Sequence, residues 1–259
     1  MKIAAVQMRI VDGSPMDNRD ALSSLLDKNP NNDLYLVPEL WTTGYVHEEW
    51  DKFAKVDTPY SIDWMANEAR RRCIWLGGSI IAINSSDSLV NRFILFNRLG
   101  ELVCKYDKVH LFRPLKEDVF LSSGKSAPPI IRCEGFRVSP AICYDIRFPE
   151  MFRRVAIEGV DIFLIPCEWP FPRQHALRIM TESRAIENQA VVVLANRIGL
   201  DLNGNEFCGC SAIYGPLERI VIAKDHSCVV SAKINSAEIL NYKTSFPVLS
   251  HRVPQIDCV

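Results

Sequence analysis

The amino-acid sequence predicts an α/β protein with helices outside mixed sheets. Short apolar runs rich in β-branched residues recur along the 259 residues and alternate with segments of helical spacing. Residues 98–101, Arg-Leu-Gly-Glu, separate two apolar runs and indicate a hairpin turn. A hairpin makes neighbouring strands antiparallel, so we expect mixed rather than purely parallel sheets.

The apolar runs have the length of buried strands and end at turn residues. They cover residues 3–8, 34–37, 74–83, 93–96, 138–143, 162–165, 191–195, 220–223 and 229–234. The clearest helical segments are residues 17–28, 61–72, 149–158 and 173–187. The third begins with proline, which suits the first turn of a helix. We expect a single domain over residues 1–259, with the tail after Phe246, including Pro247 and Pro254, as a C-terminal extension.

Composition excludes several classes of partner. The 30 basic and 31 acidic side chains nearly balance, so no positive excess is available to bind nucleic acid. The first apolar run is too short for a signal sequence or a membrane span. Nine cysteines are scattered, several inside predicted strands, which is typical of free thiols in a reducing compartment and predicts a cytoplasmic protein.

The pair Cys208-Gly209-Cys210 raises the question of a metal site. No second cysteine or histidine pair accompanies it at ligand spacing, and alternation along a strand would point both thiols to one face. We therefore interpret the pair as structural and predict no metal.

Polar residues follow predicted strands at three positions. Glu39 comes directly after the run 34–37, Cys143 ends the run 138–143, and Lys108 interrupts an apolar stretch after the hairpin. Ligands of open α/β sheets bind at the carboxyl ends of strands. A nucleophilic cysteine needs a base or a positive charge nearby, because few thiols ionise at neutral pH. Glu39 could take the thiol proton, while Lys108 and the backbone N–H of Tyr144 could stabilise an oxyanion.

Position alone also allows a plainer interpretation of each residue. A cysteine at a strand end is usually a small buried hydrophobe, and an isolated glutamate or lysine is usually a solvated charge. The surrounding motifs decide between these interpretations. The sequence contains PELWTTGY at residues 38–45, YDKVHLF at 106–112, ICYDIRFPE at 142–150, RAIENQ at 184–189 and NRIG at 196–199.

In this order the motifs resemble the nitrilase, or carbon-nitrogen hydrolase, superfamily over nearly the whole chain. The resemblance implies a catalytic triad of Glu39, Lys108 and Cys143, with Glu117 as an auxiliary residue that helps to place the substrate amide. Asp118 adjoins Glu117 and competes for that role. The resemblance also implies an α-β-β-α sandwich of two mixed sheets flanked by helices, a homodimer paired through a helical face, and no cofactor.

Within the superfamily the chain is similar to omega-amidase-like members, which release ammonia from the terminal amide of small 2-oxo acids. This similarity lies in residues 41–45, 143–150 and 169–173. A pocket for such a substrate must also hold a carboxylate, and we expect Arg173, Arg147 and Trp169 to bind it. Arg147 could instead form a structural salt bridge. The branch's His-Trp pair is absent, since His175 is followed by Ala176, so the acyl group stays open.

Other functions remain possible from the sequence. An N-carbamoyl amino-acid hydrolase, an aliphatic amidase or a nitrilase would keep the same triad. An inactive assembly or regulatory subunit would be expected to lose triad residues, which are all present. A thiol redox protein lacks support, because there is no Cys-x-x-Cys and no resolving partner for Cys143 in the sequence.

Overall fold

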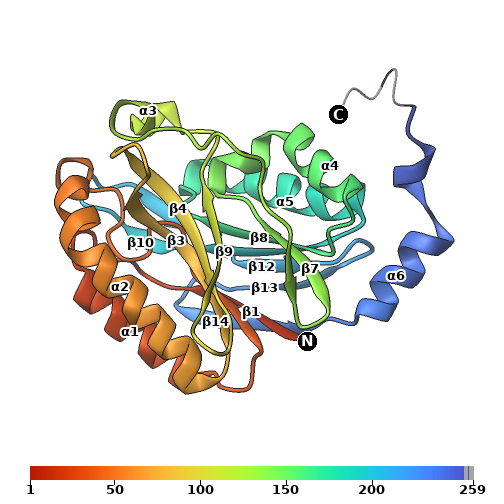
Figure 1. The fold of residues 1–259 in the computed structure, drawn as a ribbon, viewed down its shortest axis with the longest axis horizontal. Coiled ribbons are helices and arrows are strands. Elements are labelled where there is room, and N and C mark those ends of the chain that lie inside the picture. Colours follow the sequence, from red (N-terminus) through yellow and green to blue (C-terminus); the bar gives the residue numbers. More distant parts are fainter. Residues whose placement is uncertain (254–255, 257–259) are drawn as a thin grey trace.

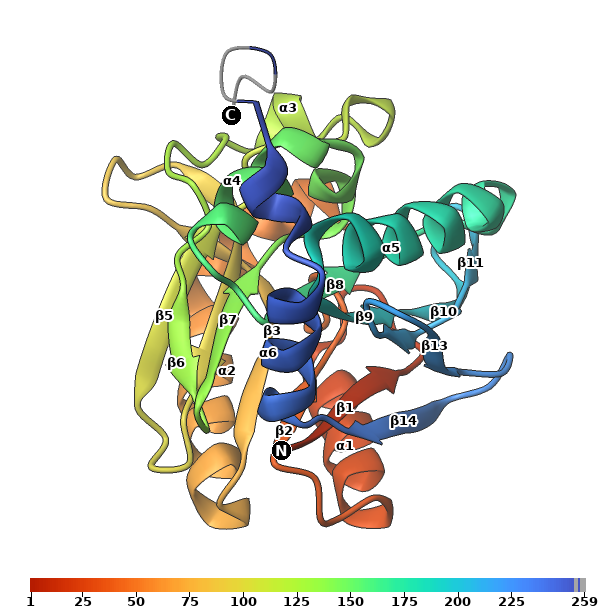
Figure 2. The same cartoon turned by 90° about the vertical axis from the view of Figure 1, so that its right-hand side faces the viewer.

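The strands form two facing mixed sheets with helices on the outer sides, as Figures 1 and 2 show. The computed structural model describes residues 1–253 and residue 256. Fold class and sheet arrangement agree with the sequence prediction, which is confirmed.

Three central strands of the first sheet run parallel and are flanked by antiparallel neighbours. In spatial order its six strands are β14 (Cys228–Lys233), β1 (Lys2–Gln7), β2 (Leu34–Leu36), β3 (Trp75–Ile83), β4 (Leu89–Phe96) and β5 (Leu102–Asp107). The predicted hairpin joins β4 to β5 at residues 97–101, where the backbone N–H of Asn97 donates to the carbonyl of Glu101. This turn is therefore confirmed.

A parallel centre with antiparallel edges recurs in the second sheet. Its order is β13 (Arg219–Ile222), β12 (Ala212–Tyr214), β9 (Val191–Asn196), β8 (Ile162–Cys167), β7 (Phe136–Pro140) and β6 (Ile131–Cys133). A separate short ribbon pairs β10 (Ile198–Leu200) with β11 (Glu206–Cys208). The sequence prediction missed β5, β6, β10, β11 and β12. Four of these have only three residues, too few for a periodic pattern, and β5 is an edge strand with polar residues.

Helices cover the outer faces. They are α1 (Pro15–Lys28) and α2 (Trp50–Arg72) on the first sheet, and α4 (Pro149–Ile157) and α5 (Gln174–Asn188) on the second, with α3 (Glu117–Phe120) above the sheets and α6 (Ser236–Ser245) near the C-terminus. The predicted helix at 61–72 was too short, since α2 begins at Trp50 and continues through Pro59. Burial of Trp50 and Phe53 outweighs the lost backbone hydrogen bond.

Alternation along β1 divides the core into layers. Ala4 and Val6 pack with Leu22 of α1, whereas Ile3 and Ala5 belong to the cluster that reaches the second sheet. Successive strand residues point to opposite faces, so the central strands are apolar on both sides. Both faces of these central strands are buried. Polar side chains that follow the strands can therefore reach solvent only at the ends of the sheets.

None of the helices within the described residues is both long and apolar enough to cross a membrane.

The turn between β4 and β5 supplies a stability prediction. Gly100 has φ +72°, and an added Cβ would lie 2.4 Å from the Ala66 carbonyl oxygen in α2. Gly135 has φ +84° with nothing within 4 Å of an added Cβ. A left-handed backbone alone costs alanine about 1–2 kcal/mol. In urea denaturation Gly100→Ala should therefore lose clearly more unfolding free energy than Gly135→Ala, and equal losses would contradict the close approach.

Candidate active site

Residues from both sheets meet at the carboxyl ends of their parallel strands. Glu39 follows β2 and Lys108 follows β5, so both come from the first sheet, while Cys143 follows β7 of the second. All three are buried, with side-chain exposure of zero for Glu39 and Lys108. The predicted strand at 138–143 was too long, because β7 ends at Pro140 and Cys143 turns the chain with φ +44°.

The Glu39 carboxylate is held at both oxygens. Its Oε1 accepts hydrogen bonds from Lys108 Nζ and Asn91 Nδ2, each at 2.8 Å, and its Oε2 accepts from the Glu168 backbone N–H at 2.9 Å. Burial raises the pKa of Glu39, and Lys108 opposes this rise. A hydrogen bond with the Cys143 thiol also acts on this carboxylate. The glutamate is thus a base of increased strength beside a thiol.

Lys108 bridges two carboxylates. Its Nζ lies 2.8 Å from Glu39 Oε1 and 2.8 Å from Glu117 Oε1, and Tyr45 OH donates to the same Glu117 oxygen. Glu117 Oε2 accepts from the Phe112 backbone N–H at 2.6 Å. The opposing charges raise the pKa of Lys108 in spite of its burial, so the amine stays protonated.

The structure separates the two adjacent carboxylates at the start of α3. Glu117 is fully buried in the site, whereas Asp118 is exposed and faces Arg113 at 3.7 Å. Glu117 therefore has the position that the resemblance implied, and the plainer interpretation as a solvated loop charge does not fit its burial.

The Cys143 thiol is neutral in this environment. Burial is the main reason that its pKa is raised, and a hydrogen bond with Cys167 and the charge of Glu39 add to the effect. Lys108 lowers the pKa as the sequence suggested, but burial outweighs it. Reaction at this sulfur consequently requires removal of its proton during attack.

Asp145 connects the Cys143 turn to the segment that carries Lys108. Its Oδ2 accepts from the Ile142 backbone N–H and from Tyr106 OH, both at 2.9 Å, and its Oδ1 accepts from the His110 backbone N–H at 3.0 Å. His110 Nδ1 also lies 2.8 Å from Oδ1. One buried carboxylate thus ties the strained turn of one sheet to the strand end of the other.

A narrow pocket opens at Cys143. The predicted substrate-binding residues Arg147, Trp169 and Arg173 all line it, as does Tyr144, whose backbone N–H was predicted to stabilise the oxyanion. The remaining lining residues are Tyr45, Phe112, Glu168 and Pro170. Its size limits the occupant to a small molecule.

Two guanidinium groups lie over aromatic rings at this pocket. Arg147 Cζ is 5.0 Å from the Trp169 ring centroid, and Arg173 Cζ is 5.4 Å from that of Phe112. Within the described part of the chain neither side chain is paired with a carboxylate. The alternative of a structural salt bridge at Arg147 is therefore not what the structure shows. His175 is exposed on α5.

Sequence reasoning missed several residues of the site. Tyr45, Asn91, Asp145 and Glu168 contact Glu39, Glu117 or the Cys143 turn, and none was singled out. A signal existed for Glu168, which follows β8 directly, as Glu39 follows β2. Asn91 lies inside β4, and its partner Glu39 follows β2 of the same sheet, so only the pairing of the strands shows the contact.

Cys208 and Cys210 are buried, and Cys210 Sγ accepts from Arg178 Nη2 at 3.2 Å. Within the described residues no group of three histidine, cysteine or acidic side chains is placed to hold a metal ion.

Comparison with known proteins places the chain in a family. The carbon-nitrogen hydrolase family matches residues 2–244. The chain belongs to this family. The 2-oxoglutaramate amidase of Bacillus subtilis is 31% identical to this amidase over 248 residues, 95% of each chain. Omega-amidase YafV of Escherichia coli K12 is 31% identical over 249 residues, 95% of this chain and 94% of its own.

Solved structures agree with the family assignment. A CN-hydrolase superfamily protein of Xanthomonas campestris, with an arsenic adduct in its active site, superposes with a TM-score of 0.91 at 30% identity, covering 98% of this chain and 97% of its own. An amidase of Nesterenkonia sp. gives 0.87 at 25% identity, covering 99% and 94%. The expectation of an enzyme that acts on carbon–nitrogen bonds is confirmed.

Asp145 gives a graded test of how the amidase positions its thiol. Asp145→Ala removes the carboxylate acceptor of two buried donors, the Ile142 N–H and Tyr106 OH, and of the part-buried His110 N–H, and a buried donor left unpaired costs about 1–3 kcal/mol. Tyr106→Phe removes only one donor and should cost about 1 kcal/mol. Urea denaturation and the kcat for ammonia release should both rank wild type above Tyr106→Phe and Tyr106→Phe above Asp145→Ala. Full activity of Asp145→Ala would exclude a positioning role.

Proposed function

We propose that this amidase hydrolyses the terminal amide of a small 2-oxo acid through a thioester on Cys143. One arrangement carries the proposal: the same narrow pocket has Cys143 at the Glu39–Lys108–Glu117 cluster and the guanidinium groups of Arg147 and Arg173 along its wall. The cluster suits amide hydrolysis, and the cations suit a substrate carboxylate.

The first half-reaction forms the thioester. The Cys143 sulfur attacks the amide carbon while its proton passes to Glu39, since the thiol is neutral at rest. Lys108 and the backbone N–H of Tyr144 stabilise the oxyanion. The carbon–nitrogen bond then breaks, and Glu39 gives its proton to the departing nitrogen, which leaves as ammonia.

The second half-reaction restores the enzyme. Water attacks the thioester carbon and yields a proton to Glu39, the carbon–sulfur bond breaks, and that proton returns to the sulfur. Glu117 holds Lys108 in place and, with Tyr45, presents an acceptor towards the substrate amide. Glu39 accordingly serves as base and acid in both halves of the cycle.

The relatives support the choice of a 2-oxo acid amide, because two curated enzymes about as long as this chain are a 2-oxoglutaramate amidase and an omega-amidase. The pocket lining supports a carboxylate on the acyl chain. Arg147 and Arg173 offer planar forks that match a carboxylate, and Trp169 fixes one of them by stacking.

We propose a cytoplasmic homodimer. The eight described cysteines are all free, which suits a reducing compartment. Ile179 and Ile186 of α5 and Ile157 of α4 are exposed on one helical layer, which suits pairing through that face.

The substrate proposal is tested by ammonia release from 2-oxoglutaramate, 2-oxosuccinamate, glutamine, N-carbamoyl-β-alanine, a simple aliphatic amide and a nitrile. Wild type should prefer the 2-oxo acid amides, and Cys143→Ala should lose at least several orders of magnitude in kcat. Cys167→Ala is the matched control, because it removes the neighbouring thiol. If another compound were preferred, the proposed substrate would be wrong. If no compound released ammonia and iodoacetamide did not alkylate Cys143 selectively, the protein would be an inactive relative.

The pH dependence of kcat/KM tests the role of Glu39. The base must be ionised, and burial raises its pKa above the ordinary 4.5 of glutamate. Activity should therefore decrease as the pH falls, with a midpoint above 4.5. Circular dichroism at each pH separates this loss from unfolding. If the folded enzyme kept a constant kcat/KM down to pH 4.5, Glu39 would not be the base.

A further inference from the structure

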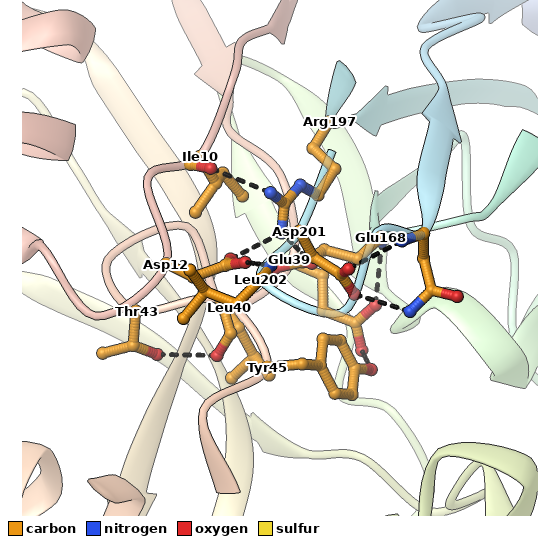
Figure 3. Close-up of polar contacts among 12 residues, drawn as sticks. Ile10, Asp12, Glu39, Leu40, Thr43, Tyr45, Glu168, Arg197, Asp201 and Leu202 are labelled. Atoms are coloured by element: carbon orange, nitrogen blue, oxygen red, sulfur yellow. Dashed lines mark hydrogen bonds and ion pairs between the residues drawn. The ribbon is translucent and has the colours of Figure 1, made fainter. Parts of the chain in front are cut away.

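A third carboxylate, that of Glu168, lines the pocket and has no role in the steps above. Glu168 directly follows β8, its side chain has zero exposure, and it lines the pocket together with Cys143. Its backbone N–H donates to Glu39 Oε2 at 2.9 Å, so the two residues are neighbours, as Figure 3 shows. Glu168 therefore adjoins the catalytic cluster.

The two oxygens of Glu168 differ in their surroundings. Oε2 accepts from Arg197 Nη1 at 2.7 Å, while Oε1 is buried and makes no hydrogen bond with any described residue. Arg197 is also engaged by Asp12 Oδ1 at 2.9 Å and by the Ile10 carbonyl at 2.8 Å (Figure 3). The arginine is therefore shared, and Oε1 is left for another partner.

The buried charges around Glu168 do not balance if every carboxyl is ionised. Glu39, Glu117, Glu168 and Asp12 are buried with two cations, Lys108 and Arg197. Uncompensated charge in a desolvated site is costly, so protonation of a carboxyl is favoured. Burial raises the pKa of Glu168 to about 8, against the lowering effect of Arg197, while Asp12 and Glu39 raise it further.

The proton of such a carboxyl belongs on Oε1, because Oε2 accepts from Arg197. A protonated Oε1 is a hydrogen-bond donor that needs an acceptor as its partner. Leaving a buried donor without a hydrogen-bond partner costs free energy. A substrate that brings an acceptor to this donor removes that cost.

We propose that Glu168 is a specificity-determining residue whose Oε1–H donates a hydrogen bond to the 2-oxo group of the substrate. This inference rests on the proposed function and deepens it. With the scissile amide at Cys143 and the carboxylate at the guanidinium groups, the keto oxygen lies between them, along the wall that Glu168 forms. An amide with an unsubstituted acyl chain leaves the Glu168 donor unpaired. An amide with a 2-ammonium group places a second donor opposite the Glu168 donor.

The experiment compares two substrates that differ only in the keto oxygen, 2-oxoglutaramate and glutaramate. Glu168→Leu should lower kcat/KM for 2-oxoglutaramate about tenfold more than it lowers kcat/KM for glutaramate, because tenfold is the value of one hydrogen bond. Glu168→Gln keeps a donor and the contact to Arg197, so it should retain most of the activity on 2-oxoglutaramate. Circular dichroism and urea denaturation check that both variants are folded, with Arg197 still paired to Asp12.

The pH profile supplies a readout that a purely structural role would not move. Wild-type kcat/KM for 2-oxoglutaramate should fall above about pH 8, where Glu168 loses its proton, and the fall should be absent in Glu168→Gln. Equal losses on both substrates in Glu168→Leu, or an alkaline fall that persists in Glu168→Gln, would overturn the role of Glu168 alone. Wild-type preference for glutamine over 2-oxoglutaramate would overturn the proposed substrate and this inference together.

Discussion

The buried contact of Lys108 with Glu39 and Glu117 is the interaction on which the site depends. Three ionisable side chains are removed from water. Their desolvation is offset by close mutual contacts at 2.8 Å, by the side chains of Asn91 and Tyr45, and by two backbone N–H donors. Removing any partner would leave a buried charge unpaired. The loops that carry these residues are therefore held in one arrangement.

The facing of two sheets makes this arrangement possible. Glu39 and Lys108 come from one sheet and Cys143 from the other. The strands before Glu39 and Cys143 are buried, whereas Lys108 follows the half-exposed edge strand β5. Asp145 then joins the two halves through the backbone of Ile142 and His110. Because its contacts reach both sheets, small movements of one sheet against the other are resisted at the thiol.

Charge is distributed unevenly along the pocket. Carboxylates surround the buried end, where the thiol proton must be accepted, and guanidinium groups stacked on aromatic rings lie further along the wall. A substrate with an uncharged amide at one end and an anion at the other fits this polarity in a single direction. Burial, with a smaller contribution from the neighbouring carboxylates, raises the pKa of the thiol and of Glu39, so proton transfer accompanies attack.

Sequence by itself determined the α/β class, the central strands and the hairpin before Lys108. It also singled out Glu39, Lys108 and Cys143. Buried strands and the residues that follow them are local patterns, so they can be read from the sequence. Motif resemblance added Glu117 and the family. Only the tertiary structure decided that Glu117 rather than Asp118 enters the site, that β7 stops before Cys143, and that Asn91, Asp145 and Glu168 belong to the cluster. Their partners lie on other strands or in the opposite sheet, and contacts between residues distant in sequence leave no periodic signal in the chain.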